Sequence, residues 1–216
     1  MRYVTAEEMK RIEREAIEKR GVTARELMER AGRALAEETK KVVRTGDIVV
    51  FCGYGNNGGD GLAAARCLMG GKYNVAVYLV GSNKTFSPDT EDNYYALTGM
   101  GMAVKNIGER DNLAEIFTSI GRPSAVIDAV FGVGLYGELD FFYTDLIDRI
   151  NGLSVPVISA DVPSGLDSDT GHPLPMAVEA LKTVTFGYPK KGFQNPAART
   201  YLGEVIVADI GLGSEK

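Results

Sequence analysis

The chain has 216 residues, of which 44% are hydrophobic and 25% charged, and its formal net charge at pH 7 is -5. This composition is that of an ordinary soluble globular protein, and the length suffices for one domain, residues 1–216, with a substantial core. The acidic balance argues against a nucleic-acid backbone or an anionic membrane as the main partner, because both recruit clustered Lys and Arg.

The N-terminal segment is densely charged, and no run has the apolar length of a secretory signal or a membrane span. The two cysteines, Cys52 and Cys67, are expected to be small unpaired hydrophobes in a reducing compartment. We therefore expect a cytoplasmic protein.

Two amphipathic helices are predicted before any strand. Thr5 and Glu8 form a capping box ahead of apolar residues at helical spacing, and this helix is expected to stop at Gly21. Thr23 and Glu26 form a second capping box, which opens a helix with a clear apolar stripe.

Short apolar, β-branched runs then predict strands, and stretches of helical composition separate the first four. The expected strands lie in residues 47–53, 74–81, 124–130, 155–161, 183–187 and 204–211, and the expected helices in 59–71, 87–99 with 109–121, and 139–152. Strands that are apolar on both faces and joined by crossover helices indicate a covered parallel sheet. We predict a three-layer α/β/α Rossmann-like domain with a mostly parallel sheet and the two N-terminal helices packed on it.

The stretch GYGNNGGDG at residues 53–61 follows the first strand, and Gly53, Gly55 and Gly58 have the spacing G-x-G-x-x-G. This spacing alone is a weak sign of a dinucleotide site, because the second strand ends YLVGSNK, without the acid of the full pattern. Asp60 would also oppose a pyrophosphate at the helix N-terminus. Asp60 could be a helix N-cap and the two asparagines turn residues, but the density of polar groups favours ligand recognition.

Asp128 and Asp161 stand at the ends of two further strands, which would place them with Asp60 on one edge of the sheet. Each could be satisfied by backbone amides, yet neighbouring like charges are destabilising. One resolution is a bound cation, since Asn57, Asp128 and Ser164 offer hard oxygen donors without a nearby Cys or His.

The loop FGVGLYGELD at residues 131–140 carries glycines that allow a close approach of the backbone to a ligand, with flexible filler as the alternative. The only histidine, His172, lies in a polar loop and is expected to be solvated. This argues against Ser-His-Asp and Cys-His catalysis.

These motifs resemble those of the NAD(P)H-hydrate epimerases. The resemblance covers nearly the whole chain, and its motifs are ELMERAG at 26–32, GNNGGDG at 55–61, DAVFGVGLYGE at 128–138, DVPSGLDSDTG at 161–171, TVTFGYPKKGF at 183–193 and VIVADIGL at 205–212. It implies an isomerase that interconverts the R and S epimers of hydrated NADH and NADPH, in which water has added to the nicotinamide ring at C6. The S epimer would pass to a separate dehydratase. Many relatives are fused to that dehydratase, whereas this chain is expected to perform epimerisation alone. We also expect it to form a homodimer.

The resemblance also implies site residues. The positions that match substrate contacts are Asn56, Asn57, Gly58, Gly59, Asp60, Gly132, Val133, Gly134, Leu135, Tyr136, Gly137, Glu138 and Asp161. Asn57, Asp128 and Ser164 match the positions that bind potassium, so the expected cation becomes K⁺. Animal relatives carry a lysine after the second strand, where this chain has Gly81, and Lys84 nearby is expected to be a solvated surface residue.

Epimerisation at C6 must break and remake a bond at a carbon that bears both a ring nitrogen and a hydroxyl. Two routes are possible: ring opening to an aldehyde, and loss of water through an iminium-like cation. Either route needs a group that moves protons. A buried carboxylate is suited to this task, and we expect Asp161 to be the acid/base residue.

Two other functions compete with this prediction. One is a non-catalytic scaffold, as in a related mRNA-decapping protein, and the other is a hydride-transferring oxidoreductase. The presence together of Asn57, Asp128, Asp161 and Ser164 favours the enzyme over the scaffold.

Overall fold

A parallel sheet forms the centre of the computed structural model, which describes residues 2–81 and 85–213. Seven strands lie in the order β3-β2-β1-β4-β5-β6-β7, and every neighbouring pair is parallel. The strands are β1 (Gly46–Cys52), β2 (Tyr73–Val80), β3 (Val104–Ile107), β4 (Ala125–Ala129), β5 (Val157–Ala160), β6 (Lys182–Phe186) and β7 (Glu204–Ala208).

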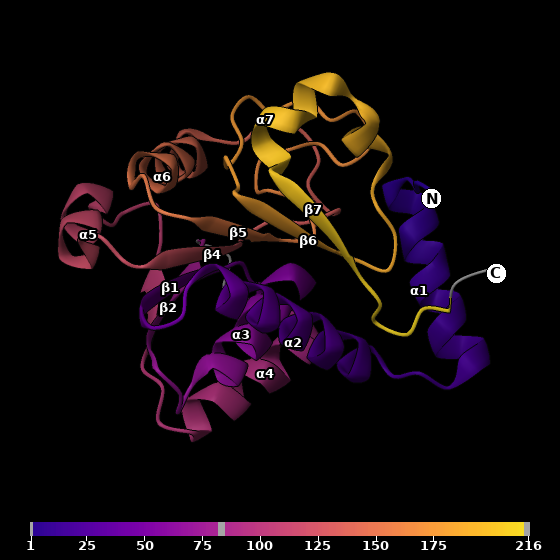
Figure 1. The fold of residues 1–216 in the computed structure, drawn as a ribbon, viewed down its shortest axis with the longest axis horizontal. Coiled ribbons are helices and arrows are strands. Elements are labelled where there is room, and N and C mark those ends of the chain that lie inside the picture. Colours follow the sequence, from indigo (N-terminus) through magenta and orange to yellow (C-terminus); the bar gives the residue numbers. More distant parts are fainter. Residues whose placement is uncertain (1, 82–84, 214–216) are drawn as a thin grey trace.

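Helices cover both faces of the sheet (Figure 1). The helices are α1 (Ala6–Arg20), α2 (Ala24–Val42), α3 (Asn56–Leu68), α4 (Pro88–Gly99), α5 (Leu113–Ile120), α6 (Phe141–Gly152) and α7 (Arg199–Leu202), with short 3₁₀ turns at Lys191–Gln194 and Pro196–Ala198. Helices α2, α3 and α4 lie on one side and α5, α6 and α7 on the other. The side chains of β1 alternate between two cores: Ile48 and Val50 join the first, and Val49 and Phe51 the second.

The predicted three-layer architecture is confirmed, with two differences in the sheet. The sheet is parallel throughout the described residues, and it contains the edge strand β3, which the sequence prediction lacked. In this strand order, the direction of winding reverses between β1 and β4. Open α/β sheets bind ligands outside the carboxyl ends of the strands at such a point.

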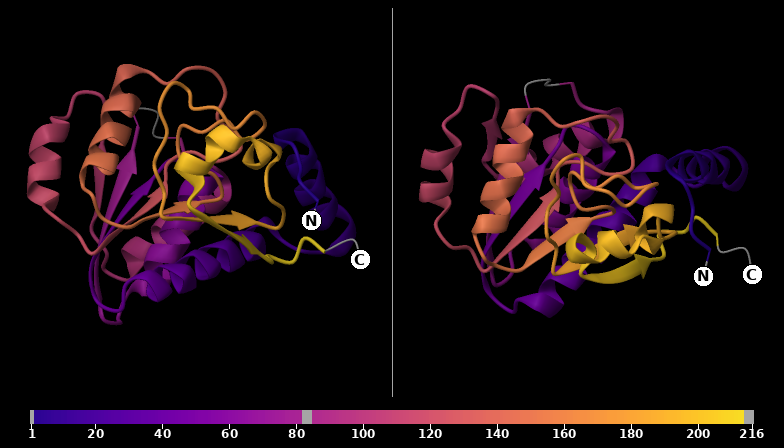
Figure 2. Two further views of the ribbon diagram at one scale, coloured as in Figure 1. Left: turned by 45° about the horizontal axis from the view of Figure 1, so that its top comes forward. Right: turned by 90° about the horizontal axis from the view of Figure 1, so that it is seen from above.

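The two N-terminal helices differ in position. Helix α2 packs beside α3, where Gly32 lies close to the backbone of Ala63. Helix α1 instead lies beyond the sheet in all views (Figures 1 and 2). Val4, just before it, forms a parallel bridge with Lys190, and the Arg20 side chain donates to the Leu212 carbonyl. The segments after β6 and β7 therefore hold α1.

Several smaller expectations can be compared with the structure. Cys52 is buried, Cys67 is half-buried, and both are free. His172 is exposed, as expected. In the part of the chain that the structure describes, no helix combines the length and apolarity needed to cross a bilayer.

Candidate functional site

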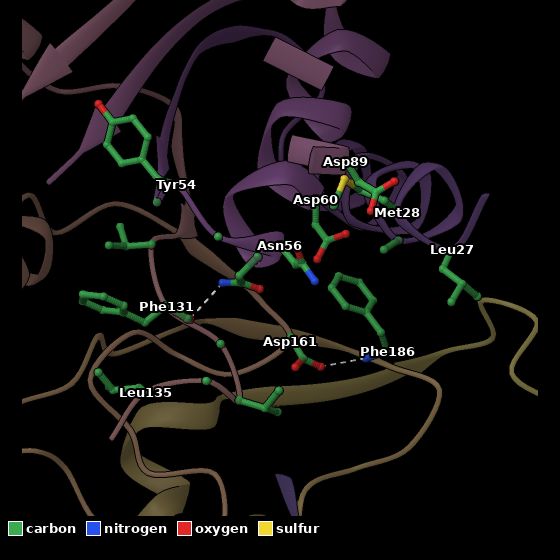
Figure 3. A pocket seen from close by; sticks show the side chains of 18 of the residues that line it. Leu27, Met28, Tyr54, Asn56, Asp60, Asp89, Phe131, Leu135, Asp161 and Phe186 are labelled. Carbon is green, nitrogen blue, oxygen red and sulfur yellow. Dashed lines mark hydrogen bonds between the residues drawn. The ribbon is translucent and has the colours of Figure 1, made fainter. Parts of the chain in front are cut away.

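A cavity of about 550 Å³ opens at the switch point between β1 and β4. This volume lies within the range of about 300–1,000 Å³ that is usual for small-molecule sites. Its walls include α1, α2, the first turns of α3, the loops after β1, β2 and β4, and the ends of β5 and β6. Figure 3 shows part of this lining. The lining includes Asn56, Asn57, Asp60, Gly132, Val133, Gly134, Leu135 and Asp161 from the predicted site.

The NNGGD stretch is the first part of a helix, not a turn. Helix α3 begins at Asn56, and its N-cap is Gly55, which has no side chain to cap the first turn. Asp60 therefore lies inside α3, and its alternative assignment as an N-cap is wrong. The first backbone N–H groups of a helix have no partner within the helix, so this N-terminus can receive an anion.

The glycines of this stretch have different surroundings. A Cβ on Gly58 would overlap the Gly53 carbonyl, and one on Gly59 would meet Met28. Gly58 and Gly59 are both buried within the protein, and neither is on the cavity lining. Their small size thus serves the packing of the β1–α3 turn and of α3.

The residues that match the potassium positions form one hydrogen-bonded chain. Asn57 Nδ2 donates to the Phe131 carbonyl at 2.8 Å, and Phe131 N donates to Ser164 Oγ at 2.9 Å. Ser164 Oγ and backbone N donate to Asp128 Oδ1 and Oδ2 at 2.5 and 2.8 Å. Asn57 Oδ1 is buried without a hydrogen-bond partner among the described residues. An unsatisfied buried oxygen is uncommon and points to a missing ligand such as a cation.

Asp128 lies deeper than the cavity wall. Its carboxylate is fully buried and also accepts from Ser159 Oγ at 2.8 Å. Burial raises the pKa of Asp128, and the hydrogen bonds from Ser164, Ser159 and the Val130 backbone oppose that rise. Asp128 and Ser164 do not line the cavity, and they reach it through Phe131 and Asn57.

Asp161 faces the cavity from the end of β5 with an unusual backbone. Its φ is 61°, in the left-handed region that only glycine enters freely, and its N–H donates to the Val184 carbonyl at 2.8 Å. Strained backbones of this kind cluster at functional sites. In Figure 3, Asp60 and Asp161 point toward the same space from α3 and from β5.

The Lys190 ammonium is a site feature that the sequence analysis missed. It is fully buried and lies 2.6 Å from Asp161 Oδ1, with Thr185 Oγ1 at 2.9 Å and the Tyr188 carbonyl at 2.8 Å. Thr185 Oγ1 and Phe186 N also donate to Oδ1, each at 3.1 Å. Within the described residues no hydrogen bond reaches Asp161 Oδ2, which leaves it for a bound molecule. The charge of Asp161 is thus balanced by the Lys190 ammonium.

Two further carboxyl groups share this wall. Desolvation and the charges of Asp161 and Glu13 raise the pKa of Asp60 well above its usual range. Desolvation and the Asp161 charge also raise the pKa of Glu13, in α1, to about 7, although Lys190 and Lys10 oppose the rise. Glu13 was not in the predicted site.

The second predicted substrate loop divides at Leu135. Residues 132–135 line the cavity, whereas Tyr136, Gly137 and Glu138 are not on its lining. Tyr136 is exposed, and the Lys10 ammonium of α1 lies 5.3 Å from its ring centroid. This cation–π contact joins α1 to the loop after β4.

The end of β2 borders the same cavity. Gly81 lines it with a φ of 127°, and a Cβ there would meet the Tyr143 hydroxyl at 2.8 Å. Lys84, expected to be a solvated surface residue, lies outside the described residues.

Comparison with known proteins gives the family. Residues 24–192 match the family described as YjeF-related protein N-terminus. The chain is 34% identical to the NAD(P)H-hydrate epimerase of Limosilactobacillus reuteri over 215 residues, which cover 96% of this chain and 95% of that protein. The Oenococcus oeni NAD(P)H-hydrate epimerase is also 34% identical, and 97% of each chain is covered. This chain belongs to the NAD(P)H-hydrate epimerase family.

Other members differ in length. The bifunctional NAD(P)H-hydrate repair enzyme Nnr of Thermofilum pendens is 40% identical over 195 residues, which cover 89% of this chain but 37% of that enzyme. Among solved structures, yeast ynu0 (YNL200c) superposes with a TM-score of 0.76 at 23% identity and covers 90% of this chain and 84% of its own. The yeast protein therefore shares the fold of this chain.

Proposed function

We propose that this protein is an NAD(P)H-hydrate epimerase that interconverts the R and S epimers of hydrated NADH and NADPH and so supplies the S epimer to a dehydratase. Identity to stand-alone relatives of that name over nearly the full chain is the observation that carries the proposal. The cavity at the switch point supports it, because polar side chains and an uncapped helix N-terminus meet there.

The cavity offers complementary surfaces for a dinucleotide. The N-terminus of α3 can donate backbone N–H groups to a phosphate oxygen, and Gly55 leaves that end open. Leu27, Met28 and Phe186, labelled in Figure 3, give the cavity an apolar surface on which a flat ring can pack.

Asp161 is the proposed acid/base residue for the change at C6. Lys190 and Thr185 fix its Oδ1, so that Oδ2 can exchange a proton with the C6 hydroxyl. The left-handed backbone aims the carboxylate away from β5 and into the cavity.

Potassium is the proposed cation, and the donors fit it. Asn57 Oδ1 is buried and has no hydrogen-bond partner in the part of the chain that the structure describes. Asp128 and Ser164 lie in the same hydrogen-bonded chain of hard oxygen atoms. The ion, when bound, supplies positive charge beside a buried carboxylate. Asn57, Asp128 and Ser164 would hold it and thereby fix the loop after β4.

Thermal unfolding tests the potassium proposal without an activity assay. A ligand that binds only the folded state raises its stability, so KCl should raise the Tm above that in LiCl or choline chloride at equal ionic strength. Asn57→Ala should remove that difference. A wild-type Tm that is the same in all three salts would contradict potassium binding.

A coupled assay tests the epimerase proposal. The protein is mixed with a purified S-specific dehydratase and an equilibrated pool of R and S hydrates, and we expect both epimers to be consumed. Consumption of the S fraction alone, with no acceleration of the R fraction, would contradict the proposal. An oxidoreductase would instead change the nicotinamide absorbance without the dehydratase.

The remaining proposals concern the oligomeric state and the cellular compartment. We propose a homodimer in the cytoplasm that acts with a separate dehydratase, and large exposed apolar side chains such as Phe141 and Leu181 offer contact surface. Light scattering at micromolar concentration decides the oligomeric state, and a monomer would contradict the dimer.

A further inference from the structure

Glu13 is a carboxyl group on the buried face of an otherwise highly charged helix. It follows Met9 by four residues and precedes Ala16 by three, and both of those side chains are buried. Residues at these spacings share one face of a helix. Glu13 therefore points toward the protein interior, where it lines the substrate cavity.

The chain fixes α1 firmly at this place. Val4 N donates to the Pro189 carbonyl at 3.0 Å, and Lys191 N donates to the Val4 carbonyl at 2.8 Å. Ala6 N, in the first turn of α1, donates to Asp169 Oδ1 at 2.7 Å. The segment that brings Lys190 to Asp161 thus also holds the start of the helix that brings Glu13.

The surroundings of Glu13 differ from those of Asp161. Asp161 has an ammonium at 2.6 Å, whereas no cation of the described residues forms an ion pair with Glu13. The charged groups that act on it are Asp161 from the end of β5, Lys190 from the segment after β6, Lys10 from its own helix, and Asp60 from α3. Among the described residues, one cavity thus holds an ion-paired carboxylate, Asp161, and also Glu13 and Asp60, two carboxyl groups without an ammonium partner.

We propose that Glu13 is a second catalytic acid/base residue, which exchanges a proton with ring nitrogen N1 of the hydrated nicotinamide while Asp161 exchanges one with the C6 hydroxyl. This inference rests on the proposed epimerase function. Asp161, whose Oδ1 is held by Lys190, is assigned to proton removal, and Glu13 is assigned to proton donation, because desolvation favours its protonated form.

The step is balanced without a co-reactant. Asp161 takes the hydroxyl proton, and the O–H electron pair becomes the second C–O bond of an aldehyde. The C6–N1 bond breaks, its electron pair moves to N1, and Glu13 gives N1 a proton. After rotation of the aldehyde, N1 attacks the opposite face while Glu13 recovers its proton and Asp161 returns one to oxygen.

Three variants of α1 test the proposal. Glu13→Gln keeps the size of the side chain but cannot donate an acidic proton, and we expect kcat to fall by about 10²–10⁴-fold. Glu13→Asp keeps a carboxyl group and should retain more activity than Glu13→Gln. Glu18→Gln, at an exposed position of the same helix, is the matched control and should match the wild type.

The pH profile separates catalysis from binding or structure. Wild-type kcat/KM should decline above a pKa of about 7, as Glu13 loses its proton. Glu13→Asp should keep a declining limb with a shifted midpoint, and Glu13→Gln should lose it. A raised KM with unchanged kcat in Glu13→Gln, or an unchanged limb, would overturn the proposal. Because wild-type epimerisation is measured in parallel, its absence would refute the proposed function instead.

Discussion

Asp161 combines a left-handed backbone with a carboxylate that faces the cavity. Asp161→Asn is a clean test, because asparagine tolerates this backbone better than most residues. We expect kcat to fall by about 10²–10⁴-fold, and we expect a lower Tm as well, because the buried Lys190 ammonium loses its carboxylate partner. The measurement is the coupled dehydratase assay together with thermal unfolding, and undiminished epimerisation would eliminate the assignment.

The ion pair between Lys190 and Asp161 is buried, so removing one partner should lower stability. Lys190→Met leaves the Asp161 carboxylate without its ammonium, and we expect a loss of about 3–5 kcal/mol in the free energy of unfolding. Adding Asp161→Asn removes the unpaired charge, so the double variant should be more stable than Lys190→Met alone. Urea unfolding of both single variants and the double variant checks this. Additive losses would show that the two side chains are not coupled.

The sequence predicted Asp161 but neither Lys190 nor Glu13, for physical reasons. Lys190 stands beside Lys191 in a polar run, and its ion-pair partner Asp161 lies 29 residues earlier in the chain. No local pattern encodes this pairing. Glu13 did carry a signal, since its spacing from Met9 and Ala16 places an acid on the apolar face of an amphipathic helix, where charged residues are uncommon.

Helix α3 and the loop after β4 use glycine for different purposes. A Cβ at Gly58 would overlap the Gly53 backbone, whereas one at Gly134 would meet no heavy atom of the described residues within 4 Å. We therefore expect Gly58→Ala to lower stability by at least about 1–3 kcal/mol through overpacking. Gly134→Ala should leave stability within about 0.5 kcal/mol of the wild type and raise KM, because the added methyl group enters substrate space.

Urea unfolding and steady-state kinetics on both variants check the contrast. Equal stability losses would contradict the packing role of Gly58, and an unchanged KM in Gly134→Ala would contradict substrate contact at that loop.

Helices and strands that are specified by a local sequence pattern were predicted, whereas those that depend on contacts with distant parts of the chain were not. Capping boxes at Thr5 and Thr23 fixed the starts of α1 and α2, as predicted. Strand β3 is four residues long, and two of them, Lys105 and Asn106, are exposed, so nothing in its sequence distinguishes it from a loop. It forms because the edge of β2 supplies hydrogen-bond partners. The sequence analysis placed the start of α3 too late, because asparagine and glycine favour turns when no tertiary contacts are considered. The helix in fact begins at Asn56.

The molecule as a whole keeps acidic groups in a cavity at a cost in stability. Glu13 and Asp60 have raised pKa values in the folded protein, so their ionised forms are disfavoured there relative to the unfolded chain. A site that excludes water makes proton transfer between carboxyl groups and substrate effective, and the same exclusion penalises their charge. Function and stability therefore oppose each other at this wall.

That opposition predicts how stability depends on pH. Between the usual glutamate pKa of 4.5 and the folded value of about 7, the folded protein binds more protons at Glu13 than the unfolded chain does. The free energy of unfolding should therefore decrease as pH rises through this window, by at most about 1.4 kcal/mol per pH unit for each such proton. Asp60 adds a decrease of the same sign.

Glu13→Gln removes one of these protons. The free energy of unfolding of this variant minus that of the wild type should therefore grow from about pH 5 to about pH 8 in urea unfolding. Glu18→Gln should follow the wild type throughout, and parallel curves for Glu13→Gln and the wild type would show that Glu13 ionises normally.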